Sequence, residues 1–135
     1  MTRLHLTAIA LSIAVAAPLS AQSISSPGNA RSYPLNDTAF EVVATGFKGS
    51  GTFWCGASRY AQRVLQVPWN TQISISRSLG SSEVTGRKSA VQFTVMPASL
   101  GIEPFRSSDP GSLAVGDTYS VSQASTECEP IWFRP

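Results

Sequence analysis

Residues 53–65 read Phe-Trp-Cys-Gly-Ala-Ser-Arg-Tyr-Ala-Gln-Arg-Val-Leu, and this stretch decides the fold. Apolar residues recur in it at spacings of three and four, which is the pattern of one face of an amphipathic helix. That face comprises Trp54, Ala57, Ala61, Val64 and Leu65. Ser50 or Thr52 is expected to cap the start of the helix, and Pro68 ends it.

The chain before this helix contains one clear strand. Residues 38–45 are apolar and β-branched, which is typical of a strand. Alternation places Phe40 and Val42 on its inner face and Glu41 on its outer face. Residues 22–36 are rich in Ser, Pro, Gly and Asn without any periodicity, so we expect a flexible lead-in there.

The chain after the helix returns to a strand pattern. Residues 71–79 and 89–96 alternate between apolar and polar, which predicts two half-buried antiparallel strands joined by the polar loop 80–88. Residues 118–123 predict a last short strand. This order favours an α+β fold, a small antiparallel sheet with one amphipathic helix packed on a face. A small β-rich barrel or sandwich is the alternative.

The start of the chain predicts export. Residues 1–21 combine a positively charged start, an apolar run over residues 6–19 and a small-residue exit, the pattern of a secretory signal peptide. The run is shorter than the roughly 20 residues of a membrane-spanning helix. We expect cleavage after Ala21, or alternatively after Ser23. Residues 37–135 are then one small exported domain, periplasmic or secreted, without a transmembrane segment.

The two cysteines are expected to form one structural disulfide. Cys55 and Cys128 are the only cysteines in the sequence, and oxidising compartments favour their pairing. No Cys-x-x-Cys spacing indicates a redox site. The bridge would gather Phe53, Trp54, Trp132 and Phe133 into one aromatic cluster.

Several catalytic chemistries are missing from the sequence. The single histidine, His5, lies in the predicted signal, so the exported domain has no Ser-His-Asp or Cys-His set and no histidine metal ligand. Residues 46–52 lack the lysine that a phosphate-binding P-loop requires after its last glycine. We therefore expect no cofactor and no metal. Eight Asp and Glu residues leave a carboxylate-based hydrolase of cell-wall or surface polymer as an alternative.

The remaining candidates are binding residues. Arg59 and Arg63 lie four residues apart on the exposed helix face, where they could grip an acidic partner. Trp69 in a turn is a candidate binding anchor, and Arg87 and Lys88 belong to the hairpin loop. A net charge of +2 with 13% charged residues gives no nucleic-acid footprint.

These features together favour a non-enzymatic binding or accessory protein of the cell envelope. Its expected partner is another envelope or extracellular macromolecule. A structural envelope protein without a specific site is a further alternative.

Overall fold

The computed structural model describes residues 12–13, 22–45 and 49–128. The predicted signal peptide, apart from residues 12 and 13, lies outside the described residues, as do Trp132 and Phe133 of the expected aromatic cluster. No helix within the described ranges is long and apolar enough to cross a membrane.

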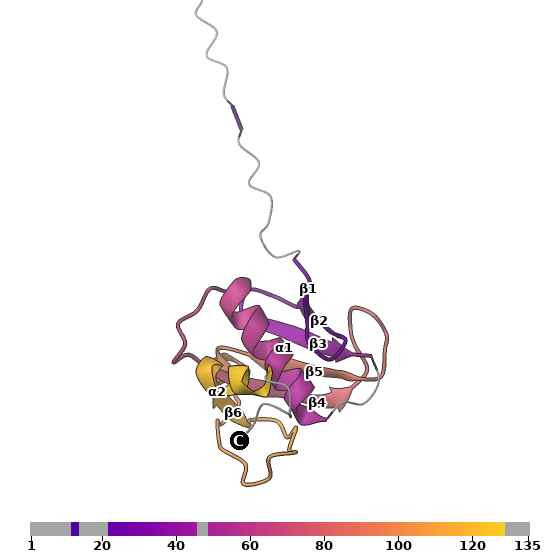
Figure 1. Cartoon of the computed structure of the whole chain (residues 1–135). Coiled ribbons are helices and arrows are strands. Elements are labelled where there is room, and N and C mark those ends of the chain that lie inside the picture. The colour runs from indigo at the N-terminus through magenta and orange to yellow at the C-terminus, as the bar shows by residue number, and fades with distance from the viewer. Residues whose placement is uncertain (1–11, 14–21, 46–48, 129–135) are drawn as a thin grey trace, which may run out of the picture.

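The described chain forms one antiparallel sheet with two helices packed on it, and the sheet curls into a half-barrel (Figure 1). Its neighbours run in the order β1-β2-β3-β5-β4-β6, and every neighbouring pair is antiparallel. The α+β prediction is confirmed. The strands are β1 Ile24–Ser26, β2 Ala30–Pro34, β3 Ala39–Ala44, β4 Gln72–Gly80, β5 Ala90–Thr94 and β6 Thr118–Ser120.

Helix α1, Ser50–Arg63, connects β3 to β4 and covers one face of the sheet (Figure 1). The hairpin strand β5 then inserts between β3 and β4, so these two strands run parallel to each other without pairing. The predicted apolar face is confirmed, since Trp54 and Ala61 are buried. The predicted cap is wrong, because Gly49 occupies the capping position.

Aromatic rings fill the space between α1 and the sheet. Phe40 of β3 stacks on Tyr60 of α1 with ring centroids 4.3 Å apart. Trp54 meets Phe93 of β5 edge-on at 5.1 Å and stacks on Tyr119 of β6 at 4.3 Å. These contacts from three strands fix the helix on the sheet, because large buried rings contribute most of a small core's apolar area.

Two predictions about the ends of the domain are wrong. The expected flexible lead-in, residues 22–36, contains the paired strands β1 and β2. The expected strand over residues 118–123 stops at Ser120, where a second helix, α2 (Val121–Ser125), begins. A capping box starts this helix, because Ser120 Oγ accepts from Gln123 N at 3.1 Å and Ser120 N donates to Gln123 Oε1 at 3.2 Å.

Candidate functional site

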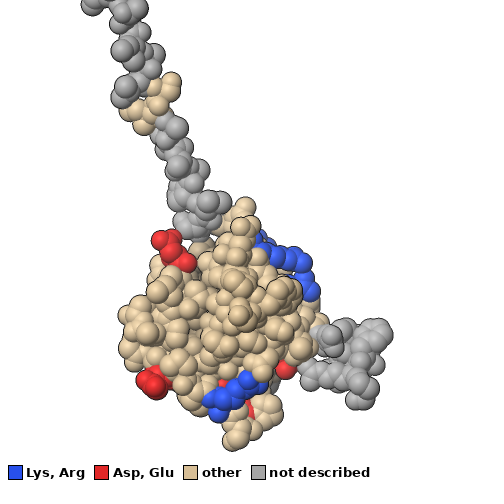
Figure 2. Space-filling model, turned by 90° about the vertical axis from the view of Figure 1, so that its left-hand side faces the viewer, with Lys and Arg blue, Asp and Glu red and all other residues tan. Residues whose placement is uncertain are grey.

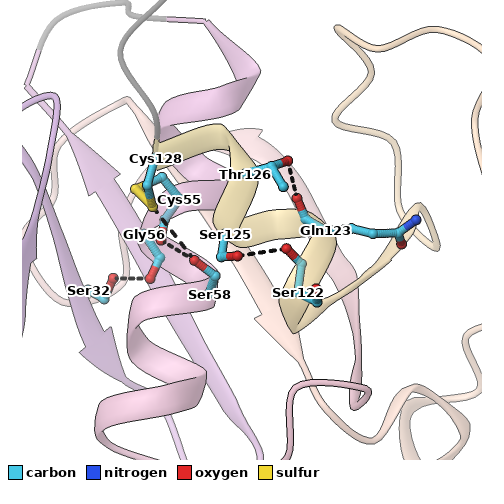
Figure 3. Close-up of a disulfide and its surroundings, with 9 residues drawn as sticks. All are labelled: Ser32, Cys55, Gly56, Ser58, Ser122, Gln123, Ser125, Thr126 and Cys128. Carbon is cyan, nitrogen blue, oxygen red and sulfur yellow. Dashed lines mark hydrogen bonds between the residues drawn. A yellow bond between two sulfur atoms is a disulfide. The ribbon is translucent and has the colours of Figure 1, made fainter. Parts of the chain in front are cut away.

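The two cysteines form the predicted disulfide (Figure 3). It joins Cys55 in α1 to Cys128 at the end of the short 3-10 helix Thr126–Cys128, with Cα atoms 4.8 Å apart. Beside it, Ser58 Oγ donates to Cys55 O at 2.9 Å and lies 3.8 Å from Cys128 Sγ. Cys55 is buried, and both sulfurs are used in the bond. The bridge is therefore a scaffold that clamps the end of the described chain to α1.

A buried carboxylate lies on the opposite face of the sheet. Glu41 alternates with Phe40 and Val42 and so points away from α1, as predicted, but its exposed fraction is 0%. The outer face is covered at this point, because the β4–β5 loop folds back across it. The side chain of Ser82 and the backbone N–H groups of Glu83 and Val84 all donate to the Glu41 carboxylate.

Two further groups complete the surroundings of this carboxylate. Gln92 Nε2 of β5 donates to Glu41 Oε2 at 3.4 Å. Arg77 Nη2 of β4 lies 3.9 Å from the same oxygen and donates to the carbonyl of Ser81. A buried charge with this many donors is compensated, which is the condition for keeping it inside a protein. Glu41 therefore anchors the loop rather than meeting a substrate.

Ser82 takes part in the same local structure. Its Oγ accepts from the backbone N–H groups of Val84 at 3.1 Å and Thr85 at 2.8 Å while it donates to Glu41. Such side-chain bonds to the following amides define a tight polar turn. A glutamate inside an otherwise apolar strand was the sequence signal for this cluster.

A pocket of about 440 Å³ opens next to Glu41 on this second face. Residues 35–36 of the β2–β3 turn, Leu100 at the end of the 3-10 helix Pro97–Leu100, and Ile102 form part of its wall, and the strands and the β4–β5 loop form its base. Its lining is half apolar and half polar, made of Leu35, Asn36, Ala39, Ser76, Glu83, Gln92, Leu100 and Ile102. Glu83 is the one carboxylate among these lining residues.

The turn after α1 holds an exposed tryptophan on a fixed backbone. The indole of Trp69 is 58% exposed, whereas Trp54 is 1% exposed. The carbonyl of Trp69 accepts from Ser122 N at 3.0 Å, and that of Pro68 accepts from Thr71 N at 3.0 Å. The turn is thereby bound to the first residues of α2. A large amphipathic ring held in this way loses little conformational freedom on binding.

The five predicted binding residues lie on two different surfaces. Arg59 and Arg63 belong to α1, and Trp69 lies in the turn after that helix, where its carbonyl is hydrogen-bonded to α2. Arg87 and Lys88 belong to the loop that covers Glu41 on the other side. The basic side chains visible in Figure 2 likewise lie in separate groups with uncharged surface between them. The structure therefore separates Arg59, Arg63 and Trp69, on or directly after α1, from Arg87 and Lys88 in the β4–β5 loop.

No group of three or more potential metal-ligating side chains occurs within the described parts of the chain. No protein-family model, no curated protein and no solved structure matches this chain.

Proposed function

We propose that the protein is a small exported binding domain that recognises an acidic region of another envelope or extracellular macromolecule. The binding surface is formed by Arg59, Arg63 and Trp69. The observation that carries the proposal is the exposed indole of Trp69 on a turn that two backbone hydrogen bonds hold in place. Tryptophan and arginine are the residue types that most often dominate protein interfaces.

The two arginines supply the charge of the proposed surface. They lie on the side of α1 away from the sheet, with Arg63 exposed and Arg59 partly exposed. Residues four apart on a helix are neighbours, so both guanidinium groups can reach one acidic segment. Export is supported by the predicted signal peptide and by the disulfide, a bond that persists in oxidising compartments.

The hydrolase alternative has less support. A glycosidase needs two carboxyl groups facing one cleft, and Glu83 is the one carboxylate among the described residues that line the pocket. Glu41 lies nearby, but the loop covers it completely. We therefore favour a non-enzymatic role.

The test is capture of a partner with matched variants. The immobilised protein is incubated with envelope and secreted material from the producing cells, and retained species are identified by mass spectrometry. We expect at least one species to be retained by the wild type, lost with Trp69→Ala and with Arg59→Ala/Arg63→Ala, and released by high salt.

Arg87→Ala/Lys88→Ala is the control, because it removes the same charge from the other side of the sheet and should leave capture intact. Retention that is equal in all variants, or absent in all, contradicts the proposal and leaves the structural alternative. Polymer hydrolysis by the purified wild type that Glu83→Gln abolishes would instead establish the hydrolase.

A further inference from the structure

The pocket on the second face of the sheet has the size and lining of a small-ligand site. Its volume of about 440 Å³ falls within the usual range for such sites. Leu35, Ala39, Leu100 and Ile102 provide apolar wall. Leu100 is 52% exposed, so a ligand that covers it gains apolar burial.

The hydrogen bonds made by the described residues leave several polar groups of the pocket available to a ligand. Asn36 Oδ1 already accepts from Thr38 N at 2.9 Å and Ala39 N at 2.8 Å, which leaves its amide nitrogen as a neutral donor. Gln92 donates a hydrogen bond from Nε2 to Glu41, and its Oε1 remains available as an acceptor. The carboxylate of Glu83 has no partner among the described residues and is the strongest remaining acceptor.

The backbone of Glu83 is held in position, while its side chain is exposed. Its backbone N–H donates to Glu41 Oε2 at 3.2 Å, and the preceding Ser82 is 6% exposed. Arg77 is directed at Glu41 and the carbonyl of Ser81, and the cations Arg87 and Lys88 of the same loop do not line the pocket. Glu83 is the one charged residue in the pocket lining, and a carboxylate next to apolar wall selects a ligand that has a positive charge on an apolar body.

We propose that this pocket binds a small organic amine, with its ammonium group on Glu83 and its hydrocarbon part against Leu100 and Ile102. The ammonium donates to the Glu83 carboxylate and to Gln92 Oε1. This site lies on the face of the sheet away from α1, so it does not depend on the surface of Arg59, Arg63 and Trp69 and would persist if that surface bound nothing.

The test uses n-hexylammonium as the probe, with hexan-1-ol and hexanoate as equal-length neutral and anionic comparisons. Titrations of the full exported domain are followed by amide and side-chain NH₂ shifts. We expect n-hexylammonium to shift the signals of Asn36, Glu83 and Gln92 and to bind about 10-fold more tightly than hexan-1-ol, since a charge-assisted hydrogen bond contributes on that scale. Hexanoate should bind most weakly of the three.

Glu83→Gln keeps the shape of the side chain and removes its charge. We expect it to weaken n-hexylammonium binding about 10-fold and to leave hexan-1-ol binding unchanged. Glu103→Gln removes an exposed carboxylate that does not line the pocket and should change neither. Equal binding of the amine and the alcohol, an unchanged affinity in Glu83→Gln, or no shifts at these residues would overturn the proposal.

Discussion

Glu41 and Ser82 stand 41 residues apart in the sequence, and the hydroxyl of Ser82 donates a hydrogen bond to the buried carboxylate of Glu41. This bond and those from the next two amides hold the β4–β5 loop across the face of the sheet that α1 does not cover. The same loop carries Glu83 into the pocket. One buried carboxylate thus holds in place the loop that covers this part of the second face.

Replacing Glu41 by Gln should loosen this loop. In glutamine an NH₂ group takes the place of one carboxylate oxygen of glutamate. This NH₂ group cannot accept the hydrogen bonds that the oxygen receives, so a buried donor loses its partner. We expect the free energy of unfolding to fall by about 1–3 kcal/mol. Amide exchange at Glu83 and Val84 should accelerate. Denaturant unfolding and hydrogen exchange measure both effects, and Glu103→Gln, which should change stability by less than about 0.5 kcal/mol, is the control.

Gly56→Ala should destabilise the protein although alanine is the better helix former. A Cβ at Gly56 would lie 2.5 Å from Val42 Cγ1 and 3.2 Å from Ser26 Oγ. Val42 is fully buried and β-branched, so its side chain cannot rotate away from the added Cβ. We expect a loss of about 1–3 kcal/mol from overpacking.

The matched control for Gly56 is Gly80→Ala, where the nearest atom, Ser78 O, is 3.7 Å from the added Cβ. Thermal unfolding of the two variants should separate them by several degrees. Equal melting temperatures would show that α1 can move away from β3.

Removing the disulfide should cost about 4 kcal/mol, because the bridge spans 73 residues and restricts the unfolded chain. The variant Cys55→Ala/Cys128→Ala avoids leaving free thiols. Urea unfolding of this variant should reproduce the midpoint of the wild type treated with a reductant. A midpoint equal to that of the oxidised wild type would contradict the prediction.

Alkaline pH should destabilise the protein through its core tyrosines. Burial raises the pKa of Tyr60 above its ordinary value of 10, and burial, helped by Asp117 and opposed by Arg106, raises that of Tyr119. Because the folded state holds the tyrosine proton more tightly than the unfolded state does, ionisation favours unfolding. The stability contributed by the neutral tyrosines is fully present below pH 10 and is lost as the pH rises through the folded-state pKa.

Absorbance at 295 nm should show tyrosine ionisation at higher pH in the native protein than in urea. Unfolding free energies measured at pH 9 and at pH 11 test the loss of stability. Tyr60→Phe should reduce this loss, and a pH dependence identical to that of the wild type would contradict the assignment to Tyr60.

The helix α1 and strands β3, β4 and β5 could be predicted because apolar residues repeat in them with the period of the element. Strands β1 and β2 could not, for a reason visible at Ser32. Its hydroxyl donates to Gly56 O at 3.3 Å, and the helix approaches the sheet closely there. A close approach requires small residues, and small polar residues leave no apolar pattern in the sequence.

The surroundings of Glu41 show a different limit of prediction from the sequence. Alternation correctly placed Glu41 on the face away from α1, but it carries no information about which loop covers that face. The same limit applies to Arg87 and Lys88, which proximity in sequence could not assign to either side of the sheet. The capping box from Ser120 to Gln123 is a signal that could have identified α2.

The bond between Cys55 and Cys128 encloses every residue from β4 to α2 in a covalent ring. Residues 108–111 form an exposed part of that ring. A protease that cuts there yields two fragments that remain joined by the disulfide, and only a thiol reagent separates them. The domain can therefore be cut at this loop without being released in pieces.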